Sequence, residues 1–168
     1  AGSLAANVLD QLYKLIQPGT TTLEINDFCH DLILKNNAIP APLNYKGFPK
    51  SVCTSVNHVV CHGIPNEKKS LNLGDIINVD VTVILDGWYG DSSRMFVAGK
   101  PNKKNLDLLK TTYECLQIGI KEAQPGKTLG DIGYKIQEYA ENKNYSVVRD
   151  FCGHGIGQQF HTPPSVLH

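Results

Sequence analysis

The stretch NVDVTVILDGWYGDSSRMF, residues 78–96, decides the fold of the chain. Apolar residues alternate on both sides of the dipeptide Asp86-Gly87, which is typical of a β-hairpin closed by a two-residue turn. Two carboxylates, Asp80 and Asp91, interrupt the pattern, although strands disfavour aspartate. The stretch therefore predicts a hairpin with one apolar face and one chemically distinct polar face.

A two-residue turn fixes the pairing of the strands, so that Asp80 stands opposite Ser93 and Asp91 opposite Thr82. The two aspartates are then diagonal neighbours on one face, with Cα atoms about 7–8 Å apart. Carboxylates at such a separation can converge on one or two bound cations. The alternative is a pair of solvated surface aspartates, and a bulge would break this register. The opposite face would pack under helices, and it carries Val79, Val81, Val83 and Leu85.

Composition limits the function classes. The chain of 168 residues is long enough for one domain with a core, and its 16 basic and 16 acidic side chains give a formal net charge of zero. This balance does not favour a nucleic acid or an anionic membrane as partner. No apolar run could span a bilayer and no signal peptide is recognisable, so we expect a soluble, cytoplasmic chain. The odd number of cysteines, five without a Cys-x-x-Cys pair, argues against a disulfide framework and a zinc ribbon.

The order of the predicted elements gives the fold class. Helical spacing of apolar residues ends at Pro18-Gly19, and Thr21 with Glu24 has capping-box spacing at the start of a second helix. Together with the hairpin, the elements predict an α+β domain whose helices cover one face of a mostly antiparallel sheet. We expect helices over 4–16, from 21 onward, 105–123 and 128–143, a loop over 36–50, and strands near 51–57 and over 145–161.

Two histidine motifs stand outside the hairpin. In GHGIGQQFH, residues 153–161, the glycines make a helix unfavourable and let the backbone come close to a bound ligand. The His154 imidazole could ligate a divalent transition metal, but a histidine beside glycines is more often a turn residue. In NHVVCHGIP, residues 57–65, His62 stands at an expected strand end, where loops carry function, or is a satisfied structural histidine. His58 is expected to be exposed.

Three motifs, in order, resemble the type I, bacterial-type methionine aminopeptidases. They are SVCTSVNHVVCHGIP at 51–65, LGDIINVDVTVILDGWYGDSSRMF at 73–96 and GHGIGQQFH at 153–161, and the resemblance extends over nearly the whole chain. It implies the pita-bread fold, with residues 1–168 as a single, partial catalytic domain. It also implies metal-dependent removal of the N-terminal methionine, by hydrolysis of the first peptide bond with metal-activated water as the nucleophile.

The resemblance assigns expected roles to individual residues. Asp80, Asp91 and His154 match metal ligands, with Asp91 bridging two divalent ions, which could be Co, Mn, Fe, Zn or Ni. His62 and His161 match catalytic histidines that contact the substrate or its transition state. Positions that line the pocket for the methionine side chain match Tyr45, Phe48, Cys53 and Phe160. Such a pocket suits an unbranched thioether.

The sequence also departs from the family pattern. Pro42 stands where a second pocket cysteine is often found, and no residue matches the family's two glutamate ligands. We therefore expect a chain truncated at the C-terminus that binds metal weakly and, as given, hydrolyses no Met-peptide at a useful rate. The implied partners are N-terminal methionines of peptides and nascent proteins. Association with the ribosome is compatible with this role, whereas membrane or direct nucleic-acid binding is not expected, and a complete form is expected to be a monomer.

Two other classes of function stay open. One is a non-catalytic peptide-binding module on the same fold, which a metal titration would distinguish. The other is a structural zinc protein that uses Cys61, His62, Cys152 and His154. The zinc alternative is disfavoured because adjacent residues of a strand, here Cys61 and His62, point to opposite faces.

Overall fold

The computed structural model describes all 168 residues, which form two compact units. The first unit comprises residues 1–102 and 156–160, and the second comprises residues 103–155 and 161–168. The prediction of a single domain over the whole chain stays a prediction. No helix has the length and apolar character that crossing a bilayer requires.

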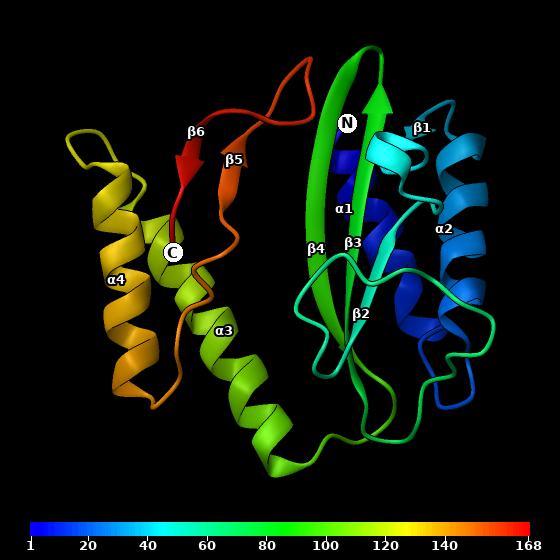
Figure 1. Cartoon of the computed structure of the whole chain (residues 1–168), viewed down its shortest axis with the longest axis horizontal. Helices are drawn as coiled ribbons and strands as arrows, with labels where there is room; N and C mark the ends of the chain where they lie inside the picture. The colour runs from blue at the N-terminus through cyan, green and yellow to red at the C-terminus, as the bar shows by residue number, and fades with distance from the viewer. The chain divides into compact units, whose positions relative to one another are not determined.

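The predicted hairpin is the centre of the first unit. Strands β3 (Ile76–Leu85) and β4 (Trp88–Val97) pair antiparallel along their whole length. The turn residues Asp86 and Gly87 have φ angles of 52° and 78°, and two positive φ values are what a type I′ turn requires. The strands β2 (Cys53–Val56) and β1 (Ile39–Pro40) also pair antiparallel with β3 and complete a four-stranded sheet (Figure 1).

One face of this sheet is covered by helices, as predicted. Helix α1 (Gly2–Gln11) continues into the short 3-10 helix η1 (Leu12–Lys14), and α2 (Thr22–Lys35) follows (Figure 1). The capping box predicted at Thr21 is present, since its hydroxyl accepts from the Glu24 N–H at 3.1 Å. The core beneath these helices consists of completely buried side chains, among them Val8, Leu12, Ile25, Ile33, Val79, Val81 and Val83.

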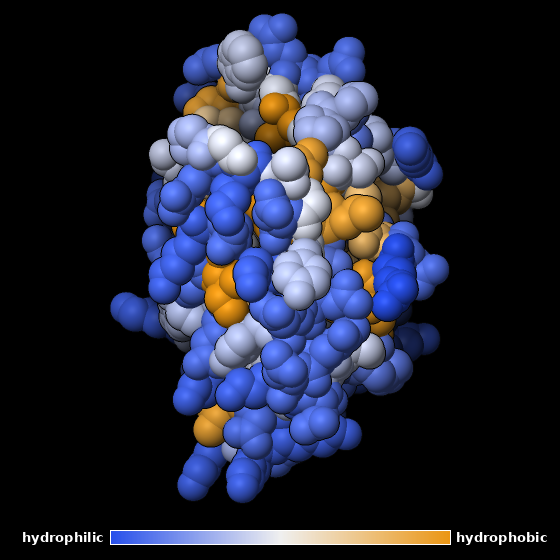
Figure 2. Space-filling model, turned by 90° about the vertical axis from the view of Figure 1, so that its left-hand side faces the viewer, coloured by the Kyte–Doolittle hydropathy of each residue, from blue (hydrophilic) through white to orange (hydrophobic).

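The second unit is built from the two predicted C-terminal helices. Helices α3 (Lys103–Glu122) and α4 (Leu129–Asn142) pack together. The structure also shows a capping box at the start of α4, formed by Thr128 and Asp131, which was not predicted. The two helices approach closely at Gly119, where a Cβ would lie 3.0 Å from Ile136 Cδ1, the far end of a flexible side chain. The face that Figure 2 presents, with α4 in front, is mostly hydrophilic with scattered hydrophobic residues.

The predicted strand over 145–161 is only partly right. Strand β5 covers Gly153–Gly155 alone, and residues 145–152 form no strand. Its partner β6 (Thr162–Val166) was not predicted, because prolines lack the N–H that a ladder needs and normally argue against a strand. The proline-rich loop over 36–50 likewise contains β1 and a 3-10 turn, η2 (Tyr45–Gly47), which its composition concealed.

Candidate functional site

The predicted register of the hairpin is confirmed. Asp80 stands opposite Ser93, and Asp91 stands opposite Thr82. Because side chains alternate along a strand, Asp80 and Thr82 share the face that points away from α1 and α2, and Asp91 lies on it too. Both aspartates are half-buried. The hairpin therefore presents two carboxylates side by side on one face of the sheet.

Thr82 orients one of these carboxylates. Its hydroxyl donates to Asp91 Oδ1 at 2.9 Å, and its side chain is only 2% exposed, so the donor is held in place by packing. Hydrogen bonds that fix a ligating group are a common outer support of metal sites. This role was missed, although the predicted pairing of Thr82 with Asp91 already contained the signal.

Cys53 lies beside both carboxylates. It pairs with Asp80 across β2 and β3 and is buried. Burial raises the pKa of the Cys53 thiol to about 12, and the charges of Asp80, Cys61 and Asp91 add to the effect. The pKa of Cys61 is raised as well, by burial first and then by Asp80. The smaller, electrostatic part of these shifts comes mainly from the carboxylates of Asp80 and Asp91, whose negative charge would stabilise a bound cation.

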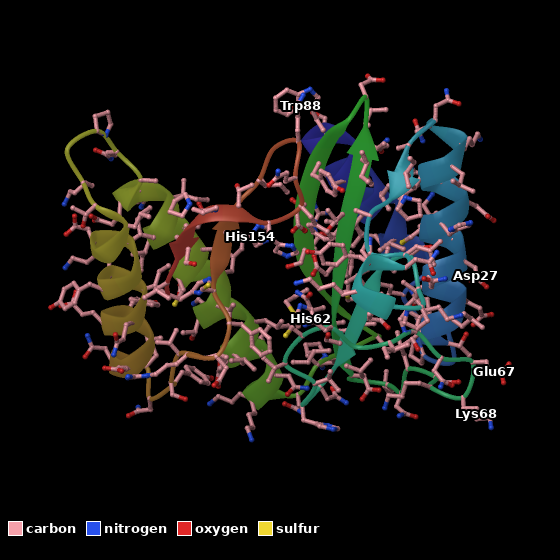
Figure 3. All side chains as sticks on the ribbon, turned by 45° about the horizontal axis from the view of Figure 1, so that its top comes forward. Asp27, His62, Glu67, Lys68, Trp88 and His154 are labelled. Atoms are coloured by element: carbon pink, nitrogen blue, oxygen red, sulfur yellow. The ribbon has the colours of Figure 1, made fainter.

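His62 is exposed on the loop that follows β2 (Figure 3). Its φ of 55° is in the left-handed region, which residues other than glycine seldom adopt. The next residue anchors the loop, since the Gly63 carbonyl accepts from the Thr54 N–H at 2.8 Å and its own N–H donates to Ser55 Oγ at 3.2 Å. A Cβ at Gly63 would lie 2.1 Å from the Thr54 carbonyl oxygen, so only glycine fits.

Three aromatic rings gather at the turn end of the sheet's polar face. The Phe160 ring centroid lies 4.8 Å from that of Tyr45 and 5.3 Å from that of Tyr89. Tyr45 and Phe160 are predicted pocket residues that the structure brings together, whereas Tyr89 was missed. Phe48, another predicted pocket residue, directly follows η2 and is half-buried. Pro42 precedes η2 and is buried.

The second unit holds the other two predicted histidines. His154 lies on β5 (Figure 3), and His161 directly precedes β6. Their ring centroids are 4.3 Å apart, and the His154 ring nitrogen Nδ1 is 3.0 Å from the Gly155 carbonyl oxygen. His154 is half-buried and His161 is exposed. The expectation that His154 joins Asp80 and Asp91 stays a prediction.

The chemistry of the candidate donors fits a divalent cation. Carboxylate oxygens and neutral imidazole suit hard and borderline divalent ions. No group of three or more His, Cys, Asp or Glu side chains is arranged to hold a metal ion on its own. A metal at Asp80 and Asp91 would therefore need ligands beyond that pair.

Comparison with known proteins identifies relatives of the whole chain. Residues 1–168 match the profile of metallopeptidase family M24. The chain is 60% identical over its full length to a methionine aminopeptidase of Rickettsia prowazekii and 55% identical to methionine aminopeptidase A of Synechocystis. It covers 64% and 66% of these relatives, so it spans just under two thirds of their length.

Structural comparison agrees. The crystal structure of the Rickettsia prowazekii methionine aminopeptidase matches 99% of this chain, with a TM-score of 0.97 and 60% identity, and 67% of that protein is covered. This similarity confirms the α+β, pita-bread fold that the sequence motifs implied.

Proposed function

Because the chain belongs to metallopeptidase family M24, we propose that it carries out metal-dependent removal of the N-terminal methionine from peptides and nascent proteins. The reaction is hydrolysis of the first peptide bond. The observation that carries the proposal is the 60% identity, over all 168 residues, to a methionine aminopeptidase, combined with two carboxylates beside an aromatic cluster.

Family membership implies a metal cofactor, and we propose that Asp80, Asp91 and His154 are its ligands in this chain. The orientation of Asp91 by Thr82 and the negative potential around Cys53 support a cation on this face. We further propose two divalent ions, from the set Co, Mn, Fe, Zn and Ni. When bound, such ions supply Lewis-acid activation of water and of the peptide carbonyl.

The remaining site residues would bind and orient the substrate. We propose that His62 and His161 donate hydrogen bonds to the scissile peptide and to the oxyanion that develops on its carbonyl. Tyr45, Phe48 and Phe160, with the Cys53 thiol, would surround the methionine side chain. Burial raises the pKa of the Cys53 thiol still further above physiological pH, so the thiol is neutral and this wall of the pocket carries no charge.

We propose that the protein acts on nascent proteins in the cytoplasm, as a monomer that associates with the ribosome. The second residue of the substrate should be small, because a large side chain would crowd the site beside the pocket. Membrane and direct nucleic-acid partners do not enter the proposal.

The test measures release of methionine from Met-Gly-Ser and Met-Lys-Ser peptides with each metal. Two proteins are compared: the 168-residue chain, and the same chain continued by the remaining part of the Rickettsia prowazekii relative. We expect release from Met-Gly-Ser in the continued chain, and its loss in an Asp91→Asn variant. Absence of release from both proteins, or equal turnover of the two peptides, would contradict the proposal.

A further inference from the structure

The tip of the hairpin holds the segment Ile156–Phe160, which belongs to the first unit. The backbone N–H of Tyr89 donates to the Gly157 carbonyl at 2.8 Å. A Cβ built at Gly157 would lie 3.8 Å from the ring of Trp88, so the indole lies in van der Waals reach of this backbone. The turn end of the β3–β4 hairpin thus holds the backbone of the segment that carries Phe160.

The ring of Tyr89 extends this contact to the Phe160 side chain. The two rings stack with an interplanar angle of 25°, and Phe160 also meets Tyr45 at 53°. Both arrangements are favourable, since aromatic rings prefer offset-stacked or tilted pairs at such separations. Phe160 therefore contacts one ring from β4 and one from η2, and both limit its rotamers.

We propose that Tyr89 is a positioning residue that sets the shape of the side-chain pocket by holding the Phe160 ring. The inference rests on the proposed function, in which Phe160 contacts the methionine side chain. The backbone and the side chain of Tyr89 make two separate interactions. The bond to Gly157 comes from the Tyr89 backbone and survives a change of side chain, whereas the stack on Phe160 comes from the ring alone.

Removing the Tyr89 ring should consequently leave the segment attached and release only the Phe160 ring. A pocket with a mobile wall would fit an unbranched thioether less well and would discriminate less against a branched side chain. An aromatic pair of this kind corresponds to about a three- to ten-fold change in a binding constant. The phenol oxygen of Tyr89 takes no part in the ring stack, so Tyr89→Phe should bind methionine as the wild type does.

The experiment compares Tyr89→Ala with Tyr89→Phe, and uses Tyr113→Ala, at an exposed tyrosine of α3, as the matched control. Calorimetry with a fixed excess of manganese(II) measures binding of L-methionine and L-leucine. We expect Tyr89→Ala to bind methionine about three- to ten-fold more weakly and to lose part of its preference over leucine. The other two variants should match the wild type.

Two spectroscopic signals follow the structure independently of binding. Phe160 ring protons in NMR spectra should shift in Tyr89→Ala and keep their positions in Tyr89→Phe. Fluorescence of Trp88, the single tryptophan, should stay unchanged if the segment remains attached. Methionine binding that is equal in wild type and Tyr89→Ala would overturn this inference alone. Failure of the wild type to bind methionine would overturn the pocket assignment and the inference together.

Discussion

Replacement of Thr82 by valine tests whether the polar face of the hairpin is organised to hold a cation. The substitution exchanges a hydroxyl for a methyl group of nearly the same shape, and β-branching is kept, so strand propensity is retained. What disappears is the 2.9 Å hydrogen bond to Asp91 Oδ1. Thr82→Ser is the matched control, because it keeps the donor and removes the methyl group.

The expected loss of stability follows from the buried position of the hydrogen bond between Thr82 and Asp91. A hydrogen bond to a charged group contributes about 1.5–3 kcal/mol, and the new methyl group at a site only 2% exposed recovers about 0.8 kcal/mol. The free energy of unfolding should fall by roughly 1–2 kcal/mol. Metal affinity should fall about 10-fold, since loss of a supporting partner of a ligand typically costs 10- to 100-fold.

Urea unfolding of the metal-free protein measures the first quantity, and calorimetric titration with manganese(II) measures the second. Thr82→Ser should bind manganese within about two-fold of the wild type, well inside the 10-fold effect expected of the valine. If Thr82→Val binds manganese as tightly as the wild type while its stability falls, the bond is purely structural and the reasoning about the cation is refuted.

Three further predictions concern other parts of the chain. Iodoacetamide at pH 8 should label the exposed Cys152 first and Cys29 and Cys53 slowly, because burial raises the pKa of the last two thiols to about 12 and leaves little thiolate. Mass spectrometry should show that labelling of Cys29 and Cys53 becomes faster as the pH rises, and that all cysteines are labelled alike in guanidinium. Thr21→Ala should lower the free energy of unfolding by about 1 kcal/mol through loss of the cap, and Thr21→Ser should restore it; equal urea midpoints would contradict this. Gly63→Ala should lower the free energy of unfolding, measured by thermal unfolding, by at least about 2 kcal/mol. Gly130→Ala should not be destabilising, because the nearest atom to the new Cβ would be Thr128 Oγ1 at 3.5 Å.

Local signals in the sequence were sufficient for most of the fold. The turn dipeptide and the alternation of apolar residues determine the register of β3 and β4, and the capping box of Thr21 and Glu24 marks where α2 begins. In each case the interacting residues lie close together in sequence, so their spacing carries the information. The histidines and aspartates of the candidate site were recognisable through motifs, but their assembly across the two units stays a prediction.

Contacts between distant segments could not be predicted in this way. The stack of Tyr89 on Phe160 joins residues 71 positions apart, and neither residue type nor spacing indicates it. The prolines of β6 concealed this strand in the sequence. Its pairing with β5 needs a glycine at position 155, because a Cβ there would lie 2.4 Å from the Pro163 carbonyl oxygen. Such contacts are fixed by packing of whole elements and leave no local pattern.

The turn of the hairpin determines the site as much as the aspartates do. Along β3, odd-numbered residues such as Val79 and Val81 are completely buried under the helices, and the even-numbered Asp80 and Thr82 face the other way. A register slip of one residue would exchange the two sets, and would move a carboxylate into the core. The cost of that burial opposes the slip, and the type I′ turn excludes it geometrically. The same alternation that builds the core therefore also places the two carboxylates together.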